Sequence, residues 1–236
     1  MSFMRFAFVA AAALALSSCI LSPGKFVSTL HIAKDRSFTF TYAGEVILLD
    51  PASAMQQGMQ EGLAGMGEEG AGDEGNMAAP APKAGSAAET AQAVAEAKAV
   101  AEALSKEVGY RSVEYLGKNR FRVDYSMTGK LDRSFVYPVN MDAKSIIPWL
   151  VVEVRKDGTA RFQALAFGDQ DMDMGAAAKP DSAPKERDGT FTFTTDAELV
   201  MQNNEAGMAP GPGKKVVWRV TPASKTVPTA VVRFTM

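Results

Sequence analysis

Few side chains in this sequence are suited to catalysis. The 236 residues include one cysteine, Cys19, and one histidine, His31. A single cysteine forms no intrachain disulfide, and a single histidine excludes metal sites and proton relays that need two imidazole rings. A nucleophilic triad of the histidine type would have to use His31, and no Gly-x-Ser-x-Gly sequence accompanies it. Cys19 is therefore the residue whose position points most directly to a defined chemistry.

Three alternating aspartates, Asp169, Asp171 and Asp173, have the spacing of the first ligands in an EF-hand calcium loop. That motif needs a glycine at its sixth position and a carboxylate at its twelfth, where this chain has Met174 and Pro180. We therefore expect a solvated acidic loop here, with weak divalent-cation binding as the alternative.

A second candidate group would form a stripe on a helix: Met55, Met59, Leu63 and Met66. Thioethers are soft ligands that suit Cu(I), and a methionine surface also suits docking of a partner or a lipid. The interspersed glycines each weaken a helix by about 1 kcal/mol relative to alanine. The pattern therefore favours a loop that contacts the core occasionally over either functional interpretation.

Charge and composition narrow the function classes further. The chain has 25 Lys and Arg against 27 Asp and Glu, a net charge of −2, whereas nucleic-acid binding needs a surplus of basic residues on one face. No glycine-rich phosphate loop follows a strand and opens a helix, and no spacing singles out a pair of catalytic carboxylates. We expect a protein that is not an enzyme and carries no cofactor or metal. The alternative is a hydrolase whose site the sequence does not reveal.

Cys19 stands at the end of an N-terminal signal sequence. Arg5 precedes the apolar run 6–16, which is too short to cross a bilayer core of about 30 Å as a helix. The run ends in Leu16, Ser17, Ser18 and Cys19. This order resembles the lipobox of bacterial lipoproteins, which consists of a leucine, two small residues and an invariant cysteine. The alternative is a secreted protein whose cleavage site happens to contain a cysteine.

The lipobox resemblance implies that residues 1–18 are removed, that the Cys19 thiol takes a diacylglyceryl group, and that the new amino terminus is acylated. Buried CH₂ groups contribute about 0.8 kcal/mol each, so several acyl chains hold a protein on a membrane permanently. Ile20 follows the cysteine in place of the aspartate that retains lipoproteins in the inner membrane. The resemblance therefore implies export to the outer membrane, with residues 19–236 as one lipid-anchored periplasmic domain.

Period-two alternation of apolar and polar residues dominates the rest of the chain. It predicts half-buried strands, typical of antiparallel sheets with one wet face. The apolar members are Phe26, Leu30, Ile32, Phe38, Phe40, Tyr42, Phe121, Val123, Tyr125, Phe135, Tyr137, Val139, Phe191, Phe193, Val216, Trp218 and Val220. His31 falls on the opposite, wet face of its strand, and residues 150–154 read as a central strand. Turns are predicted at 34–35, 117–119, 128–130, 157–158 and 188–189.

One segment follows a helical period. Residues 87–108 place Ala93, Val94, Ala97, Val100, Ala101, Leu104 and Val108 on one face, after a capping box formed by Ser86 and Glu89. Two stretches, at about 51–85 and 169–189, lack the apolar residues that offset chain entropy, and we expect mobile insertions there. The expected fold is α+β: a bent, largely antiparallel sheet of eight or more strands with the long helix packed on one face.

The segments 188–193 and 213–220, together with the lipobox, the early strands and the helical insertion, resemble the LppM-type domain of bacterial lipoproteins. The resemblance implies a β-rich envelope domain that binds an amphiphile, and it carries over no catalytic residue. The aromatic interior expected around Phe40, Trp149 and Trp218 is either a lipid-sized pocket or a packed core. We expect a membrane-anchored binding protein for a lipid or an envelope protein. A structural or assembly role is the further alternative.

Overall fold

The computed structural model describes residues 20–49, 91–138, 148–168, 186–211 and 213–234. The remaining segments, 1–19, 50–90, 139–147, 169–185, 212 and 235–236, lie outside the described residues. They include all of the predicted insertion at 51–85 and residues 169–185 of the one at 169–189, whose last two residues lie in a strand.

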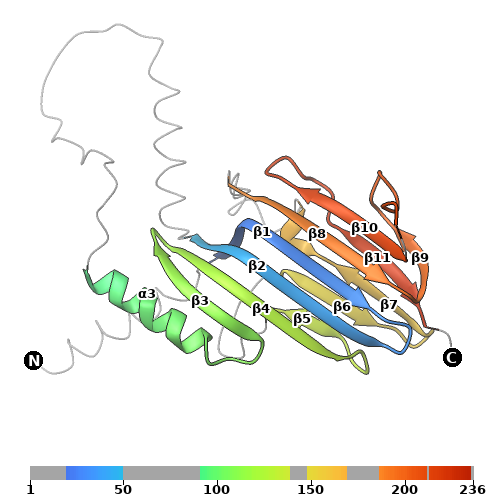
Figure 1. Ribbon diagram of the computed structural model, residues 1–236, viewed down its shortest axis with the longest axis horizontal. Coiled ribbons are helices and arrows are strands. Elements are labelled where there is room, and N and C mark those ends of the chain that lie inside the picture. Colours follow the sequence, from blue (N-terminus) through green and yellow to red (C-terminus); the bar gives the residue numbers. More distant parts are fainter. Residues whose placement is uncertain (1–19, 50–90, 139–147, 169–185, 212, 235–236) are drawn as a thin grey trace, which may run out of the picture.

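The described residues form two β-sheets and one α-helix (Figure 1). The six-stranded sheet has the order β10-β8-β1-β2-β4-β3, and the five-stranded sheet has the order β5-β6-β7-β11-β9. The elements are β1 (Ile20–Ile32), β2 (Ser37–Leu49), α3 (Ala91–Leu104), β3 (Tyr110–Gly117), β4 (Arg120–Lys130), β5 (Phe135–Tyr137), β6 (Leu150–Val154), β7 (Thr159–Gln163), the 3₁₀ helix η1 (Leu165–Phe167), β8 (Asp188–Thr195), β9 (Glu198–Gln202), β10 (Lys214–Val220) and β11 (Thr229–Arg233).

The prediction of an α+β fold, with one bent sheet covered by a long helix, is wrong. The structure is mostly β, and its strands divide into two sheets rather than one. The physical reason is that one helix is too narrow to cover the whole apolar face of the six-stranded sheet. A helix about 10 Å wide covers only about two strands spaced 4.8 Å apart. A second sheet covers the remaining apolar face, and the two inner faces pack together.

Strand pairing is antiparallel throughout both sheets except between β1 and β8. These two strands run parallel, with Leu30 opposite Phe193 and Ile32 opposite Thr195. The Thr195 hydroxyl also donates to the Ile32 carbonyl at 2.6 Å, across 163 positions of sequence. The parallel pair joins β8 to the sheet that the N-terminal hairpin begins, and β10 follows β8 as the edge strand on that side.

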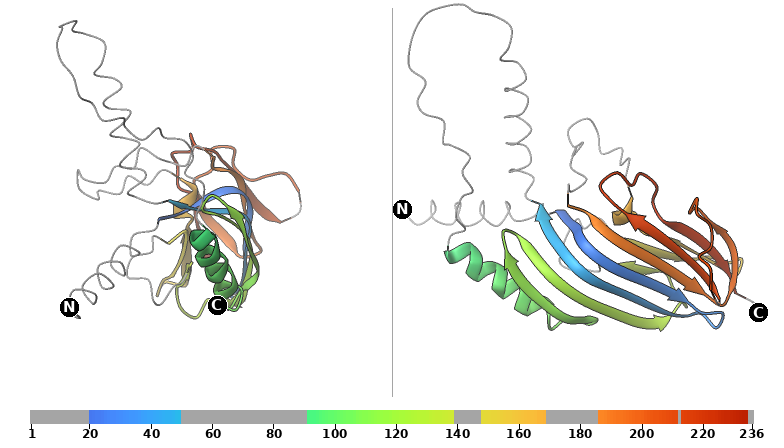
Figure 2. Two further views of the ribbon diagram at one scale, coloured as in Figure 1. Left: turned by 90° about the vertical axis from the view of Figure 1, so that its left-hand side faces the viewer. Right: turned by 45° about the horizontal axis from the view of Figure 1, so that its top comes forward.

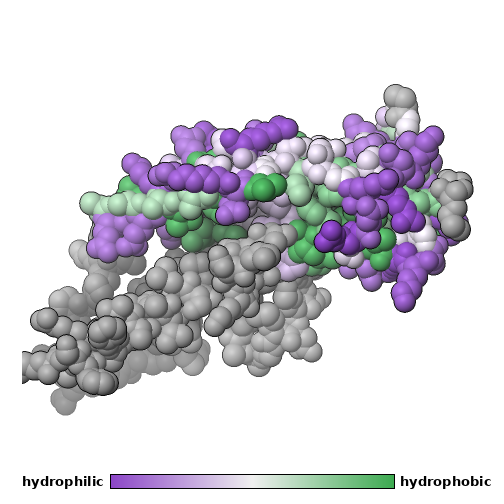
Figure 3. Space-filling view, turned by 90° about the horizontal axis from the view of Figure 1, so that it is seen from below, coloured by the Kyte–Doolittle hydropathy of each residue, from purple (hydrophilic) through white to green (hydrophobic). Residues whose placement is uncertain are grey.

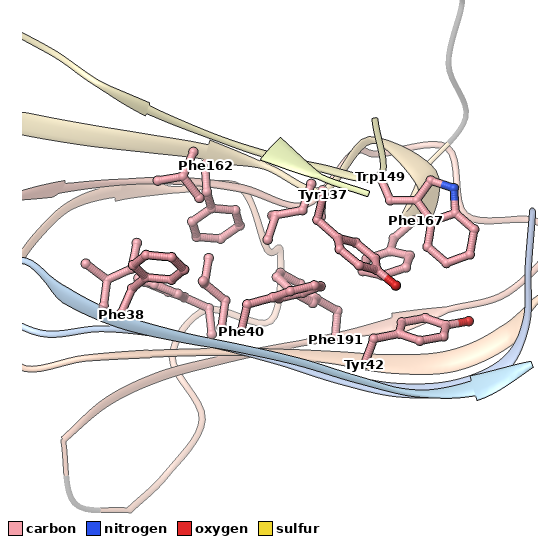
Figure 4. Close-up of a cluster of buried hydrophobic side chains, with 14 of the residues drawn as sticks. Phe38, Phe40, Tyr42, Tyr137, Trp149, Phe162, Phe167 and Phe191 are labelled. Atoms are coloured by element: carbon pink, nitrogen blue, oxygen red, sulfur yellow. The ribbon is translucent and has the colours of Figure 1, made fainter. Parts of the chain in front are cut away.

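The core lies between the two sheets and is rich in aromatic rings (Figure 4). The predicted inward-facing residues are buried, except for half-buried Phe135, and Val139 lies outside the described residues. The period-two assignments of the described residues are confirmed. Phe162 of the second sheet lies with its ring centroid 5.7 Å from Phe191, 4.7 Å from Phe193 and 6.0 Å from Trp218, all in the first sheet. The aromatic interior is therefore a packed core where these rings meet.

Helix α3 is shorter than the predicted span of 87–108. It ends at Leu104, where the Ser105 hydroxyl donates to the Ala101 carbonyl at 2.8 Å and turns follow. Ala101 is buried, and Val94, Ala97 and Leu104 are half-buried along the same stripe. Residues 87–89, with the predicted capping box, lie outside the described residues.

The predicted apolar face of this helix is only partly buried. Val100 is 48% exposed and Val108 is 78% exposed. Figure 2 shows α3 on the side of β3 that curves toward the second sheet. The narrow alanine stripe fits close against β3, and so the helix packs on this edge strand rather than across a whole face.

Two predicted turns are wrong because strand pairing takes in their glycines. Gly129 lies in β4 opposite Phe38, and Gly189 lies in β8 opposite Phe26. A Cβ at either position would come within 2.9 Å or 2.4 Å of the ring beside it. Each glycine therefore makes room for an aromatic side chain. The other predicted turns, at 34–35, 117–119 and 157–158, are present.

Candidate functional site

The predicted lipidation site, Cys19, lies outside the described residues, but the chain beside it is described. Strand β1 begins at Ile20, which pairs with Leu49, and Leu21 pairs with Leu48. Consecutive Cα atoms are about 3.8 Å apart, so no linker separates Cys19 from the sheet. We call this region the anchor end: residues 20–22, residues 47–49, the β3–β4 turn at 117–120, and Trp149.

Trp149 ties the second sheet to the anchor end. Its indole N–H donates to the Leu21 carbonyl at 3.2 Å, and the side chain is 3% exposed. The indole lies edge-on to Tyr42, with ring centroids 5.3 Å apart, and to Tyr137 at 6.1 Å. Figure 4 shows Tyr42, Tyr137 and Trp149 close together at one end of the core. Leu21, two residues after the predicted anchor, is thus held by both sheets.

A group of tyrosines lies where β3, β4 and β5 meet. The ring of Tyr125 is 5.0 Å from that of Tyr110 and 4.4 Å from that of Tyr137, and the Tyr110 and Tyr137 hydroxyls share a hydrogen bond. Deeper in the core, the Tyr42 hydroxyl donates to the Glu45 carbonyl at 2.7 Å. Buried phenols find such partners because an unpaired hydroxyl in an apolar core is unfavourable.

Burial holds these phenols in their neutral form. It raises the pKa of Tyr125 to about 12, with a smaller contribution from Tyr110. Burial also raises the pKa of Tyr137 and Tyr42 well above the usual value, and raises that of Tyr110. A neutral phenol donates and accepts hydrogen bonds but is a poor nucleophile and base near neutral pH. The tyrosines therefore suit packing and hydrogen bonding.

Arg187 is buried, with 4% of its surface exposed, and joins three segments of chain. Its Nη1 donates to the Ala166 and Gly168 carbonyls at 3.2 and 3.1 Å. Nε and Nη2 donate to the Thr221 carbonyl at 3.3 and 3.2 Å, and Nη2 donates to the Ser224 carbonyl at 3.2 Å. The guanidinium thus cross-links the end of η1, the start of β8 and the β10–β11 loop.

Sequence reasoning identified neither Arg187 nor the tyrosine hydroxyl pair. Of the hydroxyl pair, Tyr137 could have been recognised from the sequence, since it sits at an apolar position of an alternating strand and must satisfy a hydroxyl. Tyr110 was not among the residues predicted to face inward. No feature of the sequence pointed to Arg187, because its carbonyl partners lie up to 37 positions away and are brought together only by the fold.

The other residues considered from the sequence are dispersed. His31 is exposed on the wet face of β1, as predicted, and its Nδ1 lies 2.9 Å from the Thr194 hydroxyl. The aspartates of 169–173 and the methionine group of 55–66 lie outside the described residues. Within the described ranges, no three His, Cys, Asp or Glu side chains gather as metal ligands. In the same ranges, no helix is both long and apolar enough to span a bilayer.

The comparisons with known proteins give one structural likeness to report. No family model matches the chain, and a search of curated proteins finds no match. The NMR structure of the folded domain of the Mycobacterium tuberculosis LppM protein is similar with a TM-score of 0.34 and 13% sequence identity, over 92% of this chain and 93% of that one. A likeness at this TM-score carries no argument about function, so the proposals below rest on this chain's own residues.

Proposed function

We propose that this protein is a lipid-anchored, non-catalytic binding module of the bacterial cell envelope. It is attached through acyl chains on Cys19 to the periplasmic side of the outer membrane. The observation that carries the proposal is the lipobox-like run of Leu16 to Cys19, which is followed at once by the first residue of a sheet strand. A cleaved chain that begins at Cys19 begins at the edge of the folded body.

The chemistry of the buried groups supports a binding role. The buried tyrosines have raised pKa values that keep them neutral, and the buried guanidinium of Arg187 is engaged with backbone carbonyls. His31 is exposed and contacts a threonine hydroxyl. These groups stabilise the fold and do not converge as a nucleophile with a base.

An envelope protein is the partner class that the surface favours over an enclosed amphiphile. Aromatic rings fill the space between the sheets, whereas apolar side chains are exposed on the second sheet and its loops. Val200 is 43% exposed, Met201 47% and Met208 60%. Strand β9 is an edge strand, and Val200 sits at an irregularity in its pairing with β11. Figure 3 shows further hydrophobic side chains at the surface on the underside of the molecule. Exposed methionines suit adaptable protein contacts.

The anchor is tested with Cys19→Ser in the native host, using Ser18→Ala as the matched control because it keeps a small residue before the cysteine. We expect Cys19→Ser to leave the detergent phase on phase separation, and Ser18→Ala to remain in it. Mass spectrometry of the wild type should find an acylated chain that begins at Cys19. Unchanged detergent partitioning of Cys19→Ser, or a bare thiol in the wild type, contradicts the anchor.

The partner class is tested by native mass spectrometry and site-specific cross-linking. A photo-reactive residue at Met201 should cross-link to an envelope protein in intact cells, and the same group at exposed Lys34 should not. The purified protein should carry only its own acyl chains. A second lipid at near-equal stoichiometry, without a Met201 cross-link, would instead establish the amphiphile-binding alternative.

A further inference from the structure

The β3–β4 turn lies close to the point where the anchor joins the sheet. The Leu48 amide donates to the Asn119 carbonyl at 2.8 Å, and Leu48 pairs with Leu21 in β1. Neighbouring strands are about 4.8 Å apart, so two such spacings place this turn about 10 Å from the start of β1. A bilayer that holds acyl chains on Cys19 therefore lies within reach of the turn. Figure 1 shows the β3–β4 turn beside the ends of β1 and β2.

The turn itself has an unusual sequence. Lys118 and Asn119 both have positive φ angles, 51° and 57°, which identifies a two-residue hairpin turn of type I′. Asparagine and glycine are favoured at these positions, and a left-handed lysine costs on the order of 1 kcal/mol. In this backbone Lys118 is exposed at the tip of the hairpin. Leu116, two residues earlier, is a large apolar side chain that is 37% exposed.

The neighbouring charges are already paired. Arg120 bonds to Glu45 and Glu186, Arg122 pairs with Glu114 at 3.2 Å, and Arg111 pairs with Asp124 at 4.0 Å. For Lys118 no ion pair occurs within the described part of the chain. The hairpin thus presents an ammonium group at its tip beside an exposed leucine.

We propose that the β3–β4 turn is a second membrane contact, in which Lys118 binds the phosphates of anionic phospholipids and Leu116 enters the headgroup region. This inference rests on the proposed anchor at Cys19. A lysine near an anionic bilayer surface attracts it, and apolar side chains enter the boundary to a depth of about 5–10 Å. Together the anchor and the turn orient the molecule, with the β1–β2 turn directed away from the bilayer.

The experiment uses the full acylated protein in vesicles of phosphatidylethanolamine and phosphatidylglycerol. Because the chain has one cysteine and acylation consumes its thiol, Leu116→Cys or Lys34→Cys introduces one free thiol for a fluorophore. Lys34 is exposed in the β1–β2 turn, at the far end of the sheet. A nitroxide in the lipid headgroup region should quench the label at position 116 severalfold more than the label at position 34.

The charge contribution is tested by adding Lys118→Glu to the labelled Leu116→Cys protein, with Lys34→Glu as the matched control. We expect Lys118→Glu to reduce quenching severalfold in vesicles with phosphatidylglycerol, and Lys34→Glu to leave it unchanged. Equal quenching at positions 116 and 34, or no effect of Lys118→Glu, overturns the inference while sedimentation with vesicles still supports the anchor. Loss of sedimentation by the unlabelled wild type instead refutes the anchor itself. Far-UV circular dichroism verifies that each variant is folded.

Discussion

The guanidinium of Arg187 should be the most sensitive polar group of the described structure. Substitution with methionine keeps much of the apolar stem and removes every nitrogen. The carbonyls of Ala166, Gly168, Thr221 and Ser224 then lose a charged donor at 3.1–3.3 Å, inside a region where Arg187 itself is 4% exposed. Three segments of chain are released from one another.

The expected loss of stability follows from those bonds. Hydrogen bonds to charged groups contribute about 1.5–3 kcal/mol each, but carbonyls that regain water recover part of it. A buried carbonyl that is left without a donor costs about 1–3 kcal/mol, and the carbonyls of Ala166, Gly168, Thr221 and Ser224 all lose the donor that Arg187 provides. We expect Arg187→Met to lower the free energy of unfolding by about 4 kcal/mol, and the Tm by about 10 °C for a chain of this size. Arg187→Lys should recover only part of this, because a lysine ammonium has three donors on one atom.

Urea unfolding of the protein, followed by far-UV circular dichroism, measures these effects. Arg219→Met is the matched control, because the Arg219 and Asp188 side chains are 64% and 48% exposed and exposed pairs contribute about 0–1 kcal/mol. A loss of less than about 1 kcal/mol in Arg187→Met, comparable with the control, would refute the role assigned to these hydrogen bonds.

Three further predictions concern the sheets and their core. Gly44→Ala should destabilise the protein by about 1–3 kcal/mol in urea unfolding, because the new Cβ would lie 2.5 Å from the Lys25 carbonyl oxygen. The control is Gly207→Asn, which should leave the stability unchanged, because Gly207 lies in open space with φ +72°. Phe162→Ala should cost about 3–5 kcal/mol by the same assay, since it removes a ring of the second sheet that packs against rings of the first, and a loss below about 1 kcal/mol would contradict the packed core. Because the folded pKa of Tyr125 is about 12 and the unfolded pKa is 10.0, the folded state keeps a proton that the unfolded chain releases between these values. Tyr125 should therefore contribute a fall in stability of about 1.4 kcal/mol per pH unit across that window, in addition to the falls that come from Tyr42, Tyr110 and Tyr137. Tyr125→Phe should remove the contribution of Tyr125 and show a shallower fall.

The strands were predictable because the period-two pattern is a local property of the chain. Phe38, Phe40 and Tyr42 point inward wherever their strand lies, since successive side chains alternate between faces. The predicted helix was too long at its C-terminal end, because helical periodicity alone does not reveal where tertiary contacts cease. Gly129 and Gly189 were misassigned to turns for a related reason, because their neighbouring rings come from another strand.

For the candidate site too, some features could be predicted from neighbouring residues and others required the tertiary structure. Cys19 is predicted to be a lipidation site from nearby residues alone, since a signal sequence is recognised by the order of adjacent residues. By contrast, the position of the β3–β4 turn near the start of β1 required the pairing of β1 with β2 and of β2 with β4. The sequence alone gives no reason to assign Lys118 to a membrane contact, because only those pairings place it near the start of β1.

The order of neighbouring residues in the sequence was thus enough to predict the strands, their buried faces and the cysteine expected to carry lipid. The division into two sheets, the parallel pairing of β1 with β8 and the carbonyl partners of Arg187 emerged only on folding. The physical reason is that alternation specifies which face of a strand is apolar but not which distant strand will cover it. That choice depends on how all the apolar faces can be buried together while most buried backbone and side-chain polar groups keep a hydrogen-bond partner.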